Sequence, residues 1–509
     1  MAREGRRGGR AGRRAERERA GLRSLPPLRR RLPPYEILTP GELERIHEAS
    51  LDILERIGIA FQSEAACRRW RTAGARVEEL RVYIPRALLL ELVGQAPERF
   101  TIRARNPERD LEIGGTSSVF FPNYGSPFVR MFDGERRYGT LADLEVLHKL
   151  AHLAPALHGV GSIICEPVDR SVAERHLFVT LSAILHSDKV FMGPVTAPER
   201  AEDALAMAEI LFGSERIARE AVMISLVNCN SPLVWDGTML GALEVYARAG
   251  QPTIVSPFTL AGANTPASVA ATLAQLNAEA LAGIAYVQLC RPGCPVVYGN
   301  FLSTVSMKSG APMAGTSELA LMNLAIGQLA RFYRVPWRSS GLLTGSKIVD
   351  AQAGYESAFN MMPILFAGAN LVLHCAGWTE AGLTVNVAKF MLDAEQMEML
   401  YRLGRGMPFA DFEDALAAIA EVGPGGHFFG TAHTRARFQD AFFMAGLFDA
   451  NSFEQWQEEG GRDAYARGLE AARTALESYR APPLEDRIRG ELEAFVARRA
   501  EALAGGAEA

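Results

Sequence analysis

The chain has 509 residues, of which 48% are hydrophobic and 22% charged, a composition typical of a globular protein with one large domain or about three smaller ones. No stretch approaches about 18 consecutive apolar residues, which argues against a membrane-spanning helix. The net charge is −5. The six cysteines form no CxxC pair, which excludes the usual zinc and disulfide frameworks. We therefore expect free thiols, a cytoplasmic location, no bound metal ion and no association with a membrane.

Residues 1–34 form an arginine-rich tail. They hold twelve arginines and three glutamates, a local charge of +9, so the net charge of −5 leaves −14 for the remaining residues. No apolar stretch follows the arginines, which is the pattern of neither a secretory nor a twin-arginine signal. We predict a disordered tail. The tail is either an incidental extension or a segment that binds an acidic partner or nucleic acid. Of these, we favour the incidental extension and expect no nucleic acid.

An N-terminal helical layer is predicted over residues 35–112. Its main helix spans residues 39–60, where apolar residues recur at helical spacing behind Thr39 as N-cap and Pro40 at the first position. A short strand at RVYIP and a short helix at PRALLLELVGQAP follow.

Eight short apolar runs follow, separated by helix-forming stretches. They are SVFFPNY (from 118), HGVGSIIC (158), KVFMGPV (189), AVMISLVN (221), PTIVSPF (252), PVVYGN (295), VPWRSS (335) and NLVLHC (370). Apolar strands that alternate with amphipathic helices indicate parallel strands covered by helices. Eight units are typical of a (β/α)8 TIM barrel, which we predict over residues 113–405. An open doubly wound sheet is the alternative, but no glycine-rich phosphate loop follows any run.

Residues 406–509 are helical and charged in composition, with a glycine-rich loop, GPGGHFFGTAHTRARF, near their start. We predict a C-terminal helical cap here and no further barrel unit.

The chemistry of a TIM barrel lies at the carboxyl ends of its strands. The candidate residues there are Tyr124, Glu166, Asn228, Phe258, Tyr298, Trp337, Arg338 and His374. Aromatic rings recur among them, with Phe301 nearby, and ring faces attract cations, quaternary ammonium above all. The alternative is that these rings fill the upper core of the barrel.

Acid–base machinery is sparse. Glu166 is the only acid close to a strand end, and the chain has no HExxH, GxSxG or P-loop motif. We therefore predict no catalytic residue of the acid–base type.

The motifs PVVYGN, SGAPMAGTSELALMNLAIGQLARFYRVPWRSSG, SKIVDAQAGYES and GPGGHFFGTAHTRARF occur together, behind the helix that Thr39 begins. Their combination resembles the trimethylamine methyltransferase superfamily from about residue 36 to about residue 500. The resemblance implies a (β/α)8 protein that moves a methyl group from a methylamine to Co(I) of a corrinoid carried by a small partner protein. Founding members have pyrrolysine in the seventh-strand region, where residues 339–344 of this chain are standard amino acids.

The chain therefore resembles the non-pyrrolysine branch, whose members demethylate quaternary amines such as glycine betaine. A quaternary nitrogen is already cationic and leaves as a neutral tertiary amine, so positioning alone suits the reaction. Two alternatives remain: transfer from another methylated donor, and a non-catalytic protein that binds a quaternary amine or the corrinoid protein.

This hypothesis assigns roles to the strand-end residues. Trp337, Tyr298 and Phe258 wall the ammonium site, and Trp337→Ala loses about 1–3 kcal/mol of binding free energy. Arg338 or His374 pairs with a substrate carboxylate. Adjacent strand residues point to opposite faces, so Trp337 and Arg338 do not both face the interior, which makes His374 the favoured anion partner.

Tyr124, Glu166 and Asn228 complete the predicted substrate site. His427, in the glycine-rich loop, is placed by analogy on the face that meets the corrinoid protein. We further expect a homo-oligomer.

Overall fold

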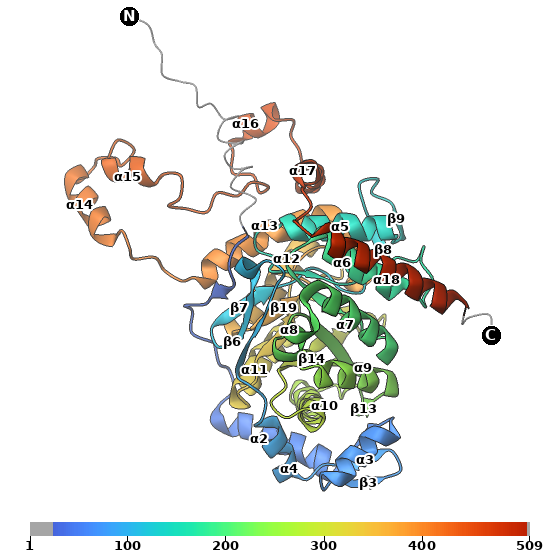
Figure 1. The fold of residues 1–509 in the computed structure, drawn as a ribbon. Helices are drawn as coiled ribbons and strands as arrows, with labels where there is room; N and C mark the ends of the chain where they lie inside the picture. Colours follow the sequence, from blue (N-terminus) through green and yellow to red (C-terminus); the bar gives the residue numbers. More distant parts are fainter. Residues whose placement is uncertain (1–23, 506–509) are drawn as a thin grey trace, which may run out of the picture.

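A parallel β-sheet covered by helices forms the centre of the structure, a computed structural model that describes residues 24–505 (Figure 1). Within these residues, eight parallel strands of the sheet follow one another along the chain. They are β7 (Ser117–Phe120), β10 (Gly159–Gly161), β11 (Val190–Gly193), β12 (Ile224–Cys229), β14 (Thr253–Ala261), β15 (Val296–Gly299), β18 (Trp337–Ser340) and β19 (Leu371–Leu373). Each overlaps one of the eight apolar runs, so the predicted α/β fold with a parallel sheet is confirmed.

The parallel strands are hydrogen-bonded in the order β10, β11, β12, β14, β15, β18, β19, β7. The last of these eight strands, β19, thus lies beside the first, β7, with Leu371 paired to Val119 and Val372 to Phe120. Helices connect the strands: α5 (Leu141–Leu153), α6 (Arg175–His186), α7 (Pro198–Phe212), α8 (Ser214–Arg219), α9 (Gly237–Arg248), α10 (Val269–Cys290), α11 (Ser317–Phe332) and α12 (Ala351–Ala367). Helix α13 (Val387–Gly404) follows the last strand. Because most strands are buried on both faces, their sequences are nearly continuous apolar runs.

Side chains alternate between two apolar clusters along each strand. On β12, Ile224 and Leu226 belong to an inner cluster of strand residues, whereas Val227 belongs to an outer cluster shared with the helices. The hairpin of β5 (Arg99–Ile102) and β6 (Leu111–Gly114) adds Ile102 to the inner cluster. Arg103 N donates to Ala221 O at 2.7 Å, just before β12 begins. The hairpin therefore fills the amino-terminal end of the sheet and leaves the carboxyl-terminal ends for a site.

The N-terminal layer begins with α2 (Pro40–Asp52), where Thr39 and Glu42 form a capping box. The predicted helix is too long: after a π-helical turn, Ile53–Ile57, the chain leaves the helix at Gly58, whose φ of 79° favours glycine. Strands β2 (Ile59–Phe61), β3 (Arg76–Glu78) and β4 (Arg81–Tyr83) and helices α3 (Glu64–Thr72) and α4 (Arg86–Val93) follow. Helix α2 packs on α10, since Ser50 Oγ donates to Ala274 O at 2.9 Å.

Part of the predicted disordered tail belongs to the fold. Residues 1–23 lie outside the described residues, but β1 (Leu28–Arg29) pairs antiparallel with the start of β7. Leu28 is fully buried, and a Cβ built on Gly404 would lie 2.6 Å from its Cδ2. The prediction is therefore wrong for residues 24–34, because one apolar side chain and a strand edge hold this charged segment in place.

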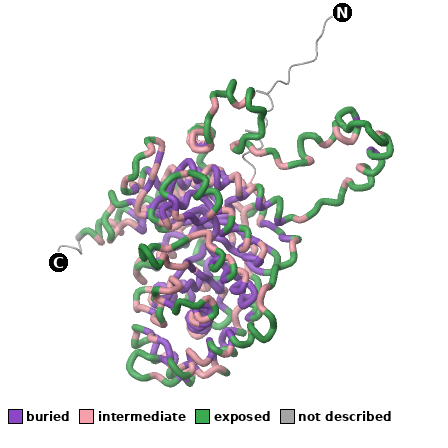
Figure 2. The backbone as a smooth tube through the Cα atoms, turned by 180° about the vertical axis from the view of Figure 1, so that it is seen from behind, coloured by how far each residue is buried: buried purple, intermediate pink, exposed green. Residues whose placement is uncertain are grey.

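The C-terminal region has two parts. Helices α17 (Ala464–Ser478) and α18 (Asp486–Gly505) pack along α13 and α5 and along α6 and α7. Residues 405–462, which we call the arm, hold α14 (Phe412–Val422), α15 (Ala432–Arg437) and α16 (Phe453–Glu458) and project from the body (Figure 1). Figure 2 shows the arm as almost wholly exposed. The division of the chain at residues 112 and 405 stays a prediction.

Short strands follow the carboxyl ends of the sheet. They are β8 (Phe128–Arg130), β9 (Arg136–Tyr138), β13 (Val234–Trp235), β16 (Phe301–Val305), β17 (Pro312–Met313), β20 (Trp378–Thr379) and β21 (Thr384–Asn386). No helix in the described part of the chain combines the length and apolar character that crossing a membrane requires.

Candidate functional site

Strand β18 places two adjacent side chains on opposite faces of the sheet. Trp337 packs outward on α11, where a Cβ built on Gly327 would lie 3.0 Å from its Cζ3, and its Nε1 donates to Asn300 Oδ1 at 2.8 Å. Arg338 lies on the inner face, since its guanidinium reaches Ser256 on β14. The expected alternation is thus present, and the residue that faces inward is Arg338.

Arg338 is a buried cation, 1% exposed, and no acidic side chain among the described residues pairs with it. Nη1 donates to Ser256 Oγ at 3.2 Å and to Asn300 O at 2.7 Å, and Nε has no partner. Burial lowers the pKa of Arg338 to about 9, because the guanidinium loses its hydration. A buried positive charge that meets only neutral atoms is suited to receive an anion.

His374 follows β19 and lies beside Arg338. Nη2 of Arg338 donates to His374 Nδ1 at 3.5 Å, and because a guanidinium can only donate, the ring proton of His374 is on Nε2. Burial, and then the charge of Arg338, hold the pKa of His374 well below its ordinary value, so the ring is neutral at physiological pH. The positive charge at this end of the sheet therefore belongs to Arg338 and not to His374, the anion partner that we favoured from the sequence.

The backbone at His374 has a φ of 58°. Residues other than glycine adopt this conformation rarely, and such strained residues concentrate at functional sites.

Four rings form a connected cluster beside Arg338. Phe258 stacks on Phe301 with ring centroids 5.1 Å apart, and the two residues are paired in register between β14 and β16. Phe301 lies 5.6 Å from the ring of His374 and 5.9 Å from that of Trp378. Trp378 in turn lies 4.5 Å from His374. Because Phe258 is 37% exposed and Trp378 is buried, the cluster runs from the surface into the interior.

Two of the three predicted cage walls lie elsewhere. Tyr298 is fully buried, and its hydroxyl donates to Asn277 Oδ1 on α10 at 3.0 Å, so its ring is on the outer face. Trp337 faces α11 in the same way. The predicted cage of Trp337, Tyr298 and Phe258 is therefore wrong. The physical reason is the phase of the alternation, which turns Val297 and Arg338 inward.

Tyr124 and Asn228 lie near the cluster. Tyr124 packs on the inner cluster, and burial raises its pKa to about 12, with a further increase from the charge of Glu166 and a decrease from that of Arg338. Asn228 is half-buried and pairs in register with Ser256, which accepts a hydrogen bond from Arg338. The part of both residues in substrate binding stays a prediction.

Glu166 is already paired, and His427 lies in the arm. Glu166 already pairs with Arg175 at 2.9 Å, so its charge is compensated. His427 is exposed in the arm, with its ring 6.3 Å from that of Phe429. The arm leaves the body at Gly404, whose carbonyl accepts from Arg31 N at 2.9 Å beside β1 and the start of β7. The place of His427 on the face that meets the corrinoid protein stays a prediction.

Trp378 is the cluster residue that the sequence analysis missed. It lies four positions after His374, beyond the strand ends that were searched, and the chain turns between them at Gly377, with a φ of 88°. The signal was an aromatic residue in HCAGW, directly after the last apolar run.

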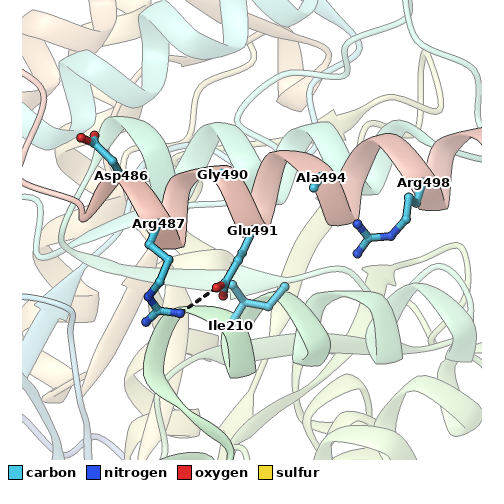
Figure 3. Close-up of a pocket in the computed structure, with 7 residues that line it drawn as sticks. All are labelled: Ile210, Asp486, Arg487, Gly490, Glu491, Ala494 and Arg498. Atoms are coloured by element: carbon cyan, nitrogen blue, oxygen red, sulfur yellow. Dashed lines mark hydrogen bonds and ion pairs between the residues drawn. The ribbon is translucent and has the colours of Figure 1, made fainter.

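Two other features of the surface lie apart from the cluster. A groove of about 490 Å³ between α7 and α18 is lined by Ile210, Asp486, Arg487, Gly490, Glu491, Ala494 and Arg498. In Figure 3 Arg487 and Glu491 pair with each other while Asp486 points away from them, so the charges do not converge on a ligand. On α2, Glu44, His47 and Glu48 could approach one metal ion, but Glu48 already pairs with Arg86 at 2.8 Å.

Comparison with known proteins identifies relatives of nearly full length. The family model of trimethylamine methyltransferase (MTTB) matches residues 6–504. A glycine betaine methyltransferase of Desulfitobacterium hafniense strain Y51 is 42% identical over 472 residues, which cover 92% of this chain and 98% of the relative. The trimethylamine methyltransferase MttB of Desulfitobacterium hafniense strain DCB-2 is 30% identical, over 89% of this chain and 92% of its own length. MttB of Methanosarcina barkeri strain Fusaro is 27% identical, over 92% and 96%.

A solved structure shares the fold. The chain in the crystal structure of the hydroxylamine MtmB complex superposes with a TM-score of 0.52, over 87% of this chain and 88% of that chain, at 11% sequence identity.

Proposed function

This chain belongs to the trimethylamine methyltransferase family and is a methyltransferase, and we propose that its methyl donor is a quaternary ammonium carboxylate such as glycine betaine. The acceptor is the cobalt of a corrinoid carried by a separate small protein. The C–N bond of one methyl group breaks, the bonding pair stays on nitrogen, and the demethylated donor leaves with a neutral tertiary amine nitrogen and an unchanged carboxylate. Residues 339–344 are standard amino acids, in agreement with the branch that lacks pyrrolysine.

The unpaired guanidinium of Arg338 carries the proposal. A carboxylate would accept charge-assisted hydrogen bonds from it and compensate a buried charge that now meets only neutral atoms. Trimethylamine has no carboxylate and would leave Arg338 unpaired. A donor with one cationic and one anionic end is therefore favoured over a simple methylamine.

A second buried donor supports the same placement. Nε1 of Trp378 has no partner in the described structure, and Trp378 contacts His374, which accepts from Arg338. Buried N–H groups are nearly always paired, so two orphan donors around one histidine support the placement of an anion there. We assign the carboxylate to Arg338 and Trp378.

The ammonium end then falls on the outer rings of the cluster. The faces of Phe258 and Phe301 offer about 0.5–2 kcal/mol each to a quaternary nitrogen, which cannot donate a hydrogen bond. Phe258 is the more exposed ring, so the methyl group to be transferred points out of the protein. Neutral His374 gives up no proton, and the residues of the site bind, orient and exclude water.

We also infer that the sheet closes into a (β/α)8 barrel. Contacts between β7 and β10, the two ends of the strand order, support closure: His158 N donates to Phe120 O at 2.7 Å, and Ser126 and Cys165 form a parallel bridge. With β19 already beside β7, these contacts would complete the circle around the inner cluster.

The corrinoid protein would approach the carboxyl ends of the strands, because the β5–β6 hairpin fills the opposite end. A cytoplasmic location is part of the proposal, since all six cysteines are free thiols.

Ligand binding tests the role of Arg338. Calorimetric titration of the full chain with glycine betaine, choline and trimethylamine should show the tightest binding for glycine betaine. In Arg338→Met, the affinity for glycine betaine should fall by about 30-fold or more, while that for choline, which lacks a carboxylate, changes by less than about threefold. Arg338→Lys should recover part of the loss, because it restores the charge without the fork.

Arg175→Met is the matched control, because Arg175 lies at the same end of the sheet but pairs with Glu166. Equal affinities of the wild-type chain for choline and glycine betaine would refute the carboxylate assignment. Methylation of a reduced corrinoid protein, followed by its visible spectrum, then tests transfer itself.

A further inference from the structure

The arm exposes an unusual amount of apolar surface. Of its residues, 405–462, all of which the structure describes, only Ala418 and Thr431 are buried. Eight phenylalanines are exposed: Phe409, Phe412, Phe428, Phe429, Phe438, Phe442, Phe448 and Phe453. An aromatic side chain has a surface of roughly 150–250 Å², so the exposed parts of these eight rings leave on the order of 1,000 Å² open to water. Soluble monomers rarely expose apolar patches beyond roughly 300–600 Å², so the arm has the surface of an interface.

The arm is held at both ends and free between them. It leaves at Gly404, next to β1, and Arg402 Nη2 donates to Ala441 O at 2.6 Å where the chain returns. The carboxylate of Glu395, on α13, accepts from the backbone N of Leu447 and of Phe448, each at 2.9 Å to Oε2. These contacts fix the direction of the arm, and the eight phenylalanines still lack a cover.

The position of the arm favours a second copy of the chain over the corrinoid protein. The arm is rooted beside the start of β7, at the amino-terminal end of the strands. In Figure 1 α14 and α15 project on the side of the body opposite the β8–β9 hairpin, which follows the carboxyl ends. A partner that delivers the methyl acceptor to the ring cluster has no reason to contact this side.

The charge of the arm disfavours nucleic acid and anionic membranes as occupants. It carries four arginines and nine acidic residues, a net charge of −5. Phosphate backbones and anionic lipid surfaces repel such a segment.

The body offers an apolar face that matches the arm. On α12, Tyr355, Phe359 and Met362 are exposed at spacings of four and three residues, which places them on one stripe of the helix. Tyr355 is 77% exposed, the highest value of the three. Helix α12 packs beside α13, from whose end the arm leaves. The exposed stripe of α12 is apolar, and so are the exposed phenylalanines of the arm.

We propose that the arm packs on the α12 stripe of a second copy of this chain, in a reciprocal two-fold exchange. Each chain then gives one arm and receives one, so the contact closes on itself. Two arms bring on the order of 2,000 Å² of phenylalanine surface, which is the range of obligate homodimers. The proposal does not depend on the identity of the methyl donor.

Light scattering coupled to size exclusion tests the exchange on the full chain. The wild-type protein should be a dimer, or a larger closed assembly built from it, at micromolar concentration. The arm variant Phe429→Glu/Phe442→Glu and the stripe variant Tyr355→Glu/Phe359→Glu should each raise the dissociation constant by about 100-fold or more. All four side chains are exposed in the single chain, so far-UV circular dichroism should stay unchanged.

Ile57→Glu is the control, because Ile57 is 55% exposed and lies in the N-terminal layer, away from the arm. It should assemble like the wild type. A mixture of the arm and stripe variants should contain more dimer than either variant at the same total concentration, because the intact arm of one chain meets the intact stripe of the other.

Three results would overturn the proposal. The first is a monomeric wild-type chain at about 100 μM, a concentration at which dimers with an interface of the stated size persist. The second is a mixture of the two variants that contains no more dimer than either variant alone. The third is an arm that binds the corrinoid protein and no second copy of the chain.

Discussion

Arg338 is a cation whose hydrogen bonds reach neutral oxygens and one ring nitrogen inside the protein. Burying an ion without a counter-charge costs several kcal/mol, which folding must offset elsewhere. Proteins tolerate such a cost where function requires it, and removal of the group then stabilises the fold. The effect of a substitution on stability therefore separates a binding residue from a structural one.

Arg338→Met should therefore not destabilise the chain. We expect an unchanged or higher midpoint of thermal unfolding without ligand, whereas replacement of a large buried residue ordinarily costs about 2–5 kcal/mol. Saturating glycine betaine should raise the midpoint of the wild type and not that of the variant. A loss of several degrees in the unliganded variant would assign Arg338 a structural role.

The neutral state of His374 predicts a flat pH profile. Burial, and then the charge of Arg338, hold its pKa well below the ordinary value, so protonation of the imidazole is shifted toward more acidic solution. The affinity for glycine betaine should stay constant from about pH 6 to about pH 8, where an ordinary histidine changes its charge. A tenfold loss of affinity between these values would show that an imidazolium pairs with the ligand.

At the scale of elements, β1 shows how a charged segment enters a fold. Leu28 lies among arginines in the sequence, yet it is fully buried against α13 near Gly404 while its backbone extends the edge of β7. The local composition predicts disorder. The segment is ordered nonetheless, because the edge of β7 provides hydrogen bonds for its backbone and an apolar site for Leu28.

Leu28→Ala should thus destabilise the chain by about 2–4 kcal/mol, through lost burial and the cavity left behind. Chemical denaturation followed by circular dichroism measures the change. Tyr35→Ala, in the same segment but 63% exposed, should lower the free energy of unfolding by less than about 0.5 kcal/mol. Equal effects of the two substitutions would contradict the role given to β1.

At the scale of the whole molecule, a body and an arm have different sources of order. The body holds two apolar clusters, and α17 and α18 add Ala472, Leu492 and Val496 to the outer one. The arm has almost no buried residue and is tied to the body through Arg402 and Glu395. Stability thus belongs to the body, and we propose that assembly depends on the arm.

Replacement of residues 406–440 by a Gly/Ser linker of about six residues, which spans up to roughly 20 Å, should leave the body folded. The two ends of the excised segment are close together, because Arg402 donates to the carbonyl of Ala441. We expect the excised chain to keep its affinity for glycine betaine and to run as a monomer. Removal of residues 463–509 should instead expose the outer cluster and cause aggregation. An excised chain that fails to bind ligand would tie the arm to the site.

Much of the fold was predictable because its determinants are local. The eight apolar runs locate the strands, since burial on both faces leaves no polar alternation, and Thr39 marks the start of α2 through its capping box. The end of that helix at Gly58 and the pairing of β1 depend on contacts that the local pattern does not contain.

The sequence by itself determined that aromatic and cationic side chains gather at the strand ends, and its motifs determined the family. Only the tertiary structure decided that Arg338 faces inward while Trp337 and Tyr298 face the helices, and that Trp378 joins the cluster. The physical reason is that alternation along a strand is a relative rule. Its phase is set by the pairing of each strand with its neighbours, which brings together residues far apart in the chain.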